Sequence, residues 1–203
     1  MPFVALEGVP GSGKTTIRDI VLGHFRSAGR LTHHVGQHGW LSPEATQLIV
    51  GARRGSIQLH PEPLVAALAY DKTLHFRANI EPFVGDRLVL ADRYSISDLF
   101  LLAATGAGGY DEYVSTIPGG ILPQITFIIM CSPDIAQARL QTRASVRFLD
   151  AAESSMAASQ ILSTNLPARV SQRIVVLQNN EVGDDMKAAS FIISEIERAV
   201  YGA

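Results

Sequence analysis

A glycine-rich stretch near the amino terminus constrains the fold of this chain more than any other feature. Residues 8–15 read GVPGSGKT and satisfy the pattern G-x-x-x-x-G-K-[ST] in full. Glycine loses more conformational freedom on folding than any other residue, so such a cluster needs a local reason. Backbone N–H groups of a turn without Cβ atoms, at the positive end of a helix, form a cradle for a phosphate chain. The stretch is therefore predicted to be a phosphate-binding loop, or P-loop. Its predicted nucleotide contacts are Gly11, Ser12, Gly13, Lys14, Thr15 and Thr16.

The sequence on either side of the loop has the required strand and helix. Residues 3–6 read as a buried strand, and apolar residues recur at helical spacing over residues 17–25. A chance glycine turn is a poor alternative, because motif, strand and helix coincide within about thirty residues, as this unit demands. In it, Lys14 is predicted to place a charge on the β- and γ-phosphates, and the Thr15 hydroxyl to hold Mg²⁺. ATP and Mg²⁺ are the cofactors we expect.

Length and charge limit the kinds of partner. A chain of 203 residues is most simply one domain, and its net charge of −2 and lack of a basic block argue against a nucleic-acid partner. No apolar run approaches the ~18 residues of a membrane span, and the first residues do not resemble a leader peptide. The single cysteine, Cys131, follows an apolar run and is expected to be a buried core residue. We therefore expect no membrane partner and a reducing, cytoplasmic location.

Strand-like and helix-like segments alternate over the whole chain. Further strands are expected at 31–35, 87–91, 125–130 and 174–177, with helices at 43–54, 64–83, 95–104, 133–143, 150–162 and 186–201. This alternation is typical of a parallel sheet covered on both faces. The predicted fold is the three-layer α/β fold of P-loop NTPases, with a five-stranded parallel sheet, in one domain over residues 1–203.

Charged residues follow one of these strands directly. The sequence LVLADRYS places Asp92, Arg93 and Tyr94 after the strand at 87–91, so these residues should emerge at the sheet edge that carries the P-loop. A carboxylate there can hold Mg²⁺, and a guanidinium can bind a phosphate through two parallel hydrogen bonds. The alternative is a surface ion pair, which is common and contributes little. With a P-loop on the same sheet, the functional interpretation is favoured.

Three stretches resemble thymidylate kinases, in the same order along the chain. They are FVALEGVPGSGKTT (3–16), ADRYSISD (91–98) and LPQITFIIMCSPDIAQARLQTRASVRFLD (122–150). The resemblance implies an ATP-dependent kinase that transfers the γ-phosphate to a nucleoside monophosphate, and it implies a homodimer. In that family the aspartate of the Asp-Arg pair helps to place the metal and the arginine binds the acceptor phosphate. These roles fall here on Asp92 and Arg93.

The family also has an arginine-bearing lid after its fourth strand. The comparable segment here lies around residues 140–155, and the arginines in or next to it are Arg139, Arg143 and Arg147. Arg143 and Arg147 are the preferred catalytic lid residues, because the helix is expected to fray at these positions and a lid must be mobile. Arginines spaced about four residues apart also form a solvated helix stripe, and this alternative stays open.

The sequence departs from the family pattern on the acceptor side. Pro10 stands where thymidylate kinases carry an acidic or polar residue, the loop at 35–44 lacks an arginine, and residues 68–72 read LAYDK in place of an F-x-A-x-R motif. In that family each of these segments contacts the acceptor, so the resemblance implies an altered nucleotide or nucleotide-like acceptor here. The candidate acceptor contacts are Arg93, Tyr94, Lys72, Tyr70, Gln37 and Trp40.

Two other functions remain possible from the sequence. One is a kinase of a nucleoside or of another small metabolite's hydroxyl group, which would need a general base such as Asp92 or Glu7. The other is a nucleotide-binding regulator that hydrolyses NTP slowly and has no acceptor. A P-loop alone does not separate these functions from a nucleoside monophosphate kinase.

Overall fold

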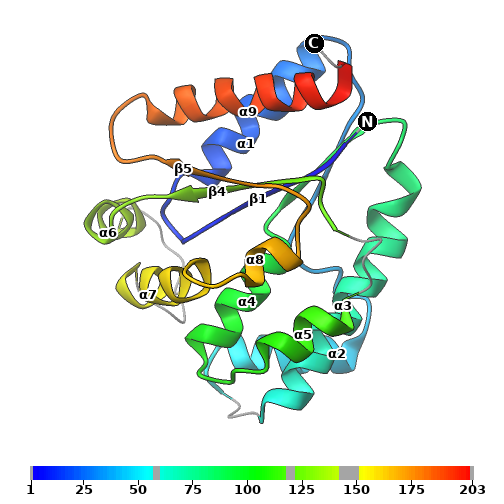
Figure 1. Ribbon diagram of the computed structural model, residues 1–203, viewed down its shortest axis with the longest axis vertical. Coiled ribbons are helices and arrows are strands. Elements are labelled where there is room, and N and C mark those ends of the chain that lie inside the picture. The colour runs from blue at the N-terminus through cyan, green and yellow to red at the C-terminus, as the bar shows by residue number, and fades with distance from the viewer. Residues whose placement is uncertain (1, 57–59, 118–121, 142–150, 202–203) are drawn as a thin grey trace.

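A five-stranded parallel sheet is the centre of the molecule in a computed structural model, which describes residues 2–56, 60–117, 122–141 and 151–201 (Figure 1). The strands are β1 (Phe3–Gly8), β2 (Thr32–Val35), β3 (Leu88–Asp92), β4 (Ile125–Met130) and β5 (Ile174–Gln178). Their spatial order is β2-β3-β1-β4-β5, so β1 is central and pairs with both β3 and β4. Because all pairs are parallel, every strand ends at the same edge of the sheet. The predicted sheet is confirmed.

Helices α1 (Lys14–Ser27) and α9 (Asp184–Tyr201) cover one face of the sheet, where they lie side by side and run in the same direction (Figure 1). The apolar stripe of α9 is strongly one-sided, as expected for a helix with one face on a sheet. The buried residues of this layer are Val4, Leu6, Leu88, Leu90, Ile125, Phe127 and Ile129 from the strands, with Ile17, Val21, Ile192 and Ile196 from the helices. These residues alternate along each strand, as the period of two demands.

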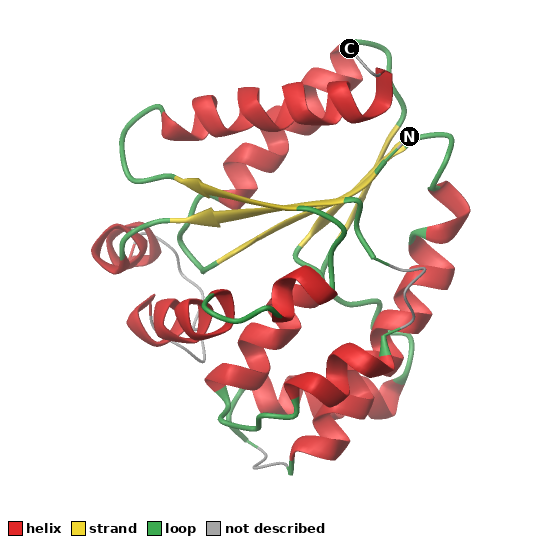
Figure 2. Cartoon of the chain, viewed as in Figure 1, coloured by secondary structure: helices red, strands yellow, loops and turns green. Residues whose placement is uncertain are grey.

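The opposite face carries the larger helical layer, which Figure 2 shows below the sheet. Its helices are α2 (Pro43–Arg53), α3 (Pro61–Asn79), α4 (Ser95–Ala104), α5 (Tyr110–Thr116), α7 (Ala151–Leu162) and α8 (Leu166–Arg169), with a 3₁₀ turn η1 at Glu81–Phe83. The helix α6 (Pro133–Gln141) follows β4 at the carboxyl edge. The expected three-layer arrangement is therefore confirmed. Within the described ranges, each helix is too short or too polar to serve as a transmembrane span.

Two helices were not expected from the sequence. α5 has 7 residues and α8 has 4, so neither is long enough to show an apolar repeat of 3.6 residues. The expected helix at 64–83 begins instead at Pro61, a favoured first helical residue, and ends at Asn79. Pro82 follows within the 3₁₀ turn, and a proline disfavours the helical conformation of the residue before it.

The end of β1 approaches β4 so closely that only glycine fits at its last residue. Gly8 has a φ of +136°, and a Cβ atom built there would lie 2.0 Å from the carbonyl oxygen of Ile129. A side chain at this position would therefore push β1 and β4 apart where the P-loop begins. The glycine is needed here by packing as well as by backbone conformation.

We expect opposite effects from two glycine-to-alanine changes. Gly8→Ala should lower the free energy of unfolding by about 3 kcal/mol or more, because it combines overpacking with a strained φ. Gly23→Ala should raise that free energy by about 0.5–1 kcal/mol, because Gly23 is exposed in α1 and its Cβ would meet no atom within 4 Å. Urea denaturation of both variants tests this. Equal midpoints would contradict the packing argument.

Candidate active site

The P-loop connects β1 to α1 and encloses the Lys14 side chain. The Lys14 ammonium donates to the carbonyl oxygens of Gly8 (2.8 Å) and Val9 (2.7 Å) and to the Ser12 hydroxyl (3.2 Å). The side chain is buried and folds back over its own loop. The positive charge therefore lies inside the turn whose backbone forms the predicted phosphate cradle.

The first turn of α1 directly follows the P-loop. Gly13, with a φ of +90°, is the residue before the helix and has no side chain that could cap it. The first N–H groups of a helix have no partner within the helix, and they favour an anion. Thr15 and Thr16 follow with exposed side chains. Of the nucleotide contacts expected from the sequence, Thr15 and Thr16 are thus exposed, whereas the side chains of Ser12 and Lys14 are buried.

Asp92 lies at the end of β3, beside the end of β1. Its register partner is Leu6, two residues before the end of β1. One oxygen of Asp92, Oδ2, accepts a hydrogen bond of 2.8 Å from Nη1 of Arg18, a residue of α1. Arg18 also pairs with the exposed Asp19. The predicted metal-binding carboxylate is therefore already in contact with a cation.

The residues predicted to hold Mg²⁺ fit that ion in chemistry. Mg²⁺ prefers oxygen ligands and keeps several waters. The hydroxyl of Thr15 is on an exposed side chain, and Asp92 Oδ1 makes no hydrogen bond within the described parts of the chain. Thr15 lies in α1, which follows the P-loop, and Asp92 ends β3, the neighbour of the strand that leads into the loop. The donor set is thus suited to Mg²⁺ bound to nucleotide phosphates.

Arg93 is held in an uncommon backbone conformation. Its φ is +73°, in the left-handed region that residues other than glycine rarely adopt. Its backbone N–H donates to the carbonyl oxygen of Leu6 at 2.9 Å, and its Nη1 donates to the hydroxyl of Ser97 at 3.0 Å. The side chain is only half-buried. The guanidinium therefore lies at the carboxyl edge, next to the strand that leads into the P-loop.

Glu7 is fully buried between these two segments. Its Oε1 accepts hydrogen bonds from the backbone N–H groups of Tyr94 (2.7 Å) and Ser97 (3.1 Å), and its Oε2 accepts one from the Ser97 hydroxyl. Burial raises the pKa of Glu7 above its ordinary value, and these hydrogen bonds and the charge of Arg93 offset only part of that rise. A carboxylate enclosed in this way is poorly placed to remove a proton from a substrate, which weakens the case for Glu7 as a general base.

Two predicted acceptor contacts, Lys72 and Tyr94, lie behind the site instead of at its surface. Both side chains are fully buried. The Lys72 ammonium donates to the carbonyl oxygen of Gln37 (2.8 Å), pairs with Asp98 Oδ2 (3.1 Å) and lies 4.3 Å from the centre of the Tyr94 ring. Tyr94 also packs edge-on against Phe3. Neither side chain offers surface to a ligand in this conformation, so neither is kept as a proposed acceptor contact.

The buried Asp98 also engages Gln37. Its Oδ1 accepts from the Gln37 amide (2.7 Å), and its Oδ2 accepts from the Tyr113 hydroxyl (2.6 Å) as well as from Lys72. The side-chain amide of Gln37 is therefore used within the protein. Tyr70 and Trp40, by contrast, are exposed by 55% and 44%. These two are the predicted acceptor contacts that have free aromatic surface.

The segment that carries Trp40 is fixed by a second buried carboxylate. Asp71 accepts hydrogen bonds from the Trp40 N–H (2.9 Å), the His38 ring (3.1 Å) and the Gly39 N–H (3.2 Å). Trp40 has a φ of +53°, and its ring lies 4.5 Å from that of His38. Burial alone would raise the pKa of Asp71, but these donors and Lys72 hold it below its ordinary value. The segment is therefore preorganised with the indole partly exposed.

Removing the Asp71 charge should destabilise the protein. Asp71→Asn is expected to lower the free energy of unfolding by about 2 kcal/mol at neutral pH, because two backbone donors and His38 lose a charged acceptor. A depressed carboxylate pKa stabilises the fold above the unfolded pKa and loses that effect as pH falls through the folded pKa. The variant should therefore show a weaker loss of stability below about pH 4.

The matched control is Asp86→Asn. Asp86 also has a lowered pKa, caused mainly by its hydrogen bonds from Arg87, but it lies at the surface. We expect little change in the free energy of unfolding, as for other exposed ion pairs. Urea denaturation at pH 7 and pH 3 compares both variants with the parent. Equal losses at the two positions would contradict the role given to Asp71.

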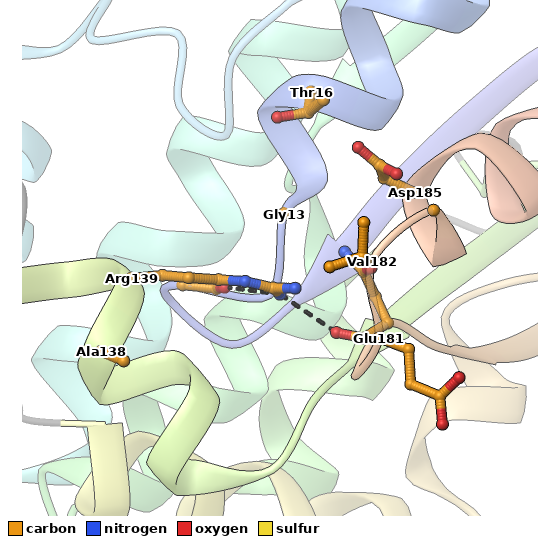
Figure 3. A pocket seen from close by; sticks show the side chains of 10 residues that line it. Gly13, Thr16, Ala138, Arg139, Glu181, Val182 and Asp185 are labelled. Atoms are coloured by element: carbon orange, nitrogen blue, oxygen red, sulfur yellow. Dashed lines mark hydrogen bonds between the residues drawn. The ribbon is translucent and has the colours of Figure 1, made fainter.

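A pocket of about 610 Å³ opens beside the P-loop, on the side where β4 and β5 end (Figure 3). Its lining residues come from the P-loop, α6 and the β5–α9 loop: Gly11, Gly13, Thr16, Ala138, Arg139, Asn179, Glu181, Val182, Gly183 and Asp185. Arg139 Nη1 donates to the carbonyl oxygens of Asn179 (3.0 Å) and Gly11 (3.3 Å). The Asn179 amide donates to the Ser12 carbonyl oxygen (2.8 Å). The pocket is therefore continuous with the phosphate cradle.

Residues 179–185 were not predicted from the sequence to belong to the site. A polar run, NNE, follows the last strand directly, as DRY follows β3. Polar residues at the end of a parallel strand are the signal that could have indicated them. The preferred lid arginines, Arg143 and Arg147, lie outside the described residues. Of the segment expected to form the lid, the structure describes the end of α6 and the beginning of α7.

A P-loop at the centre of a parallel sheet, with an aspartate and an arginine at the end of the neighbouring strand, defines a P-loop phosphotransferase. The chain belongs to the thymidylate kinase family, whose model matches residues 6–181. It is an ATP-dependent nucleoside monophosphate kinase.

Individual relatives agree with the family match. The chain is 30% identical over 146 residues to a probable thymidylate kinase of Pyrobaculum aerophilum, covering 70% of this chain and 71% of the relative. It is 28% identical over 156 residues to the thymidylate kinase of Mycoplasma pneumoniae, covering 73% and 72%. It is 27% identical over 150 residues to a thymidylate kinase of Bifidobacterium longum, covering 68% and 71%.

Proposed function

We propose that this kinase transfers the γ-phosphate of Mg-ATP to the phosphate of a nucleoside monophosphate held by Arg93. One observation carries the proposal: the Arg93 N–H donates to Leu6 in the strand that leads into the P-loop. The donor cradle and the acceptor arginine therefore leave neighbouring strands at one edge. In the reaction an acceptor phosphate oxygen bonds to the γ-phosphorus, and the bond from that phosphorus to the β–γ bridging oxygen breaks to release ADP.

The donor side accommodates ATP along the P-loop and into the adjoining pocket. The loop N–H groups and Lys14 are proposed to bind the phosphates, with the ammonium exchanging its carbonyl partners for phosphate oxygens. The nucleoside then extends into the pocket of about 610 Å³ beside Arg139. A pocket of that size is sufficient for an adenosine group. The β5–α9 loop forms one wall of this pocket.

Mg²⁺ is proposed to be held by Thr15 and Asp92. When bound, the ion neutralises charge on the phosphates during transfer. The guanidinium of Arg18 pairs with the same Asp92 carboxylate, so it competes with Mg²⁺ for that carboxylate. The protein's own contribution is then to fix the carboxylate at the strand end and to keep one oxygen accessible. The predicted lid residues, Arg143 and Arg147, are proposed to exclude water and to balance the remaining charge.

Arg18→Gln should strengthen Mg²⁺ binding. Loss of a unit positive charge near the Asp92 carboxylate is worth about 1 kcal/mol at the surface, or roughly fivefold in affinity. Calorimetric titration of Mg²⁺ into the protein with a non-hydrolysable ATP analogue measures this directly. Asp19→Asn is the control, because it removes the exposed partner of Arg18 and leaves the pair with Asp92. Weaker Mg²⁺ binding in Arg18→Gln would show that Arg18 instead holds Asp92 in place.

The acceptor is proposed to be a nucleoside monophosphate that contacts Trp40 and Tyr70. The relatives above are named thymidylate kinases, and thymidine monophosphate is accordingly the first acceptor to test. The departures at Pro10 and Leu68 and the loop without arginine support a pocket that differs from theirs. A homodimer and a cytoplasmic location, inferred from the resemblance and from the sequence, remain predictions.

Arg93→Ala tests the proposed function. The variant should lose about a hundredfold or more in kcat/KM for the acceptor, since a charged phosphate contact is removed, while ATP affinity stays within about twofold. ADP release is measured with a panel of nucleoside monophosphates, nucleosides and other small alcohols. Stimulation by nucleosides alone would favour the hydroxyl kinase. Slow hydrolysis with no stimulation by any acceptor would favour the nucleotide-binding regulator.

A further inference from the structure

The buried carboxylate of Glu7 connects the donor and acceptor halves of the site. We propose that Glu7, acting through the Ser97 hydroxyl, is a positioning residue that sets the orientation of the Arg93 guanidinium toward the acceptor phosphate. The inference rests on the proposed function, because it assigns a supporting role to a site in which Arg93 binds the acceptor.

The hydrogen bonds form a chain with one direction. A guanidinium can only donate, so the Ser97 hydroxyl accepts from Arg93, and the hydroxyl in turn donates to Glu7 Oε2. The Arg93 Nη1 to Ser97 Oγ distance is 3.0 Å, and Ser97 Oγ contacts Glu7 Oε2. A hydroxyl that donates a hydrogen bond to a carboxyl oxygen is a better acceptor, which strengthens its bond with Arg93.

Glu7 also fixes the backbone around Arg93. Its Oε1 accepts from the N–H groups of Tyr94 and Ser97, so one carboxylate binds the residue after Arg93 and the first turn of α4. Arg93 itself has a φ of +73°, an unfavourable conformation that persists only when surrounding contacts determine it. The Glu7 hydrogen bonds and the bond from Arg93 N–H to Leu6 are those contacts. Strain at this residue is consistent with a role in the site.

The position of Glu7 in the chain explains how one residue can contact both the P-loop strand and the segment that carries Arg93. Glu7 is the next-to-last residue of β1 and immediately precedes the P-loop. Tyr94 and Ser97 lie 87 and 90 residues further on. A displacement of the P-loop strand is therefore transmitted to Arg93 through one rigid, fully buried side chain. The distance between the donor cradle and the acceptor guanidinium is set by this contact as well as by the strand pairing.

A general-base role for Glu7 has less support than the positioning role. Each of its oxygens already accepts from the protein, and its side chain has no exposed surface. A phosphate acceptor brings its own ionised oxygen, so phosphoryl transfer to it needs positioning and charge more than proton removal. The same contacts that exclude proton transfer are the ones that orient Arg93.

The test compares Ser97→Ala with the matched control Ser95→Ala. Both serines are buried in the first turn of α4, but only Ser97 joins Glu7 to Arg93. The acceptor used is the nucleoside monophosphate that the parent protein phosphorylates fastest in the panel above. Ser97→Ala should raise the acceptor KM about tenfold and leave the KM for ATP within about twofold. Ser95→Ala should leave both within about twofold.

The variant Glu7→Gln provides a second test of the positioning role. Glutamine keeps the size of the side chain but offers one acceptor oxygen for three donors, so the acceptor KM should rise at least as much as in Ser97→Ala. The two changes act on one chain of contacts, so the double variant should be no worse than Glu7→Gln alone. Calorimetric binding of a non-hydrolysable ATP analogue to each variant confirms that the P-loop is intact.

Two outcomes would overturn the inference. In one, Ser97→Ala and Ser95→Ala have the same effect on the acceptor KM. In the other, both KM values rise together in Glu7→Gln, as loss of general packing would cause. Arg93→Ala separates this result from failure of the proposed function. If Arg93→Ala lowers acceptor turnover and Ser97→Ala does not, only the positioning role is wrong, whereas a parent protein that uses no nucleoside monophosphate contradicts the function itself.

Discussion

The parallel pairing of β1 with β3 is the contact on which the rest of the site depends. It puts Leu6 opposite Asp92 and lets Leu6 accept the N–H of Arg93. One strand leads into the P-loop and the other ends in the acid–arginine pair, so a single ladder of backbone hydrogen bonds fixes the distance between donor and acceptor groups. A register shift of one residue would turn the following side chains to the opposite faces of the sheet.

The donor half could be predicted from the sequence because its contacts are local. Gly8, Lys14 and Thr15 lie within one strand–loop–helix unit, and the sterics of glycine, the helix N-terminus and the lysine charge act over a few residues. Asp92 and Arg93 were found by the same reasoning, as charged residues at the end of a buried strand. Asn179 occupies the equivalent place after β5 and was missed, since an amide run is a weaker signal than a charged pair.

The acceptor half could not be predicted in the same way. Whether Lys72 faces a ligand depends on Asp98 and Gln37, which come from other elements and take up its ammonium. Polar side chains are mostly exposed, so a sequence gives no sign that a lysine is fully buried and paired. The short helices α5 and α8 escaped prediction for a related reason, because they have too few residues to show periodicity and are held by packing on their neighbours.

Buried carboxylates organise the acceptor half. Glu7, Asp71 and Asp98 each accept several hydrogen bonds from residues distant in the chain, so the β3–α4 turn, the segment at 38–40 and helix α3 form one rigid support. A buried charge is tolerated only when its donors are in place, which makes this support resistant to change. The side chains of Trp40 and Tyr70 are exposed and take no part in these hydrogen bonds, although Asp71 holds the backbone of Trp40. If Trp40 and Tyr70 contact the acceptor as proposed, a change in acceptor specificity is physically easiest at these exposed side chains, while the support and the donor half stay as they are.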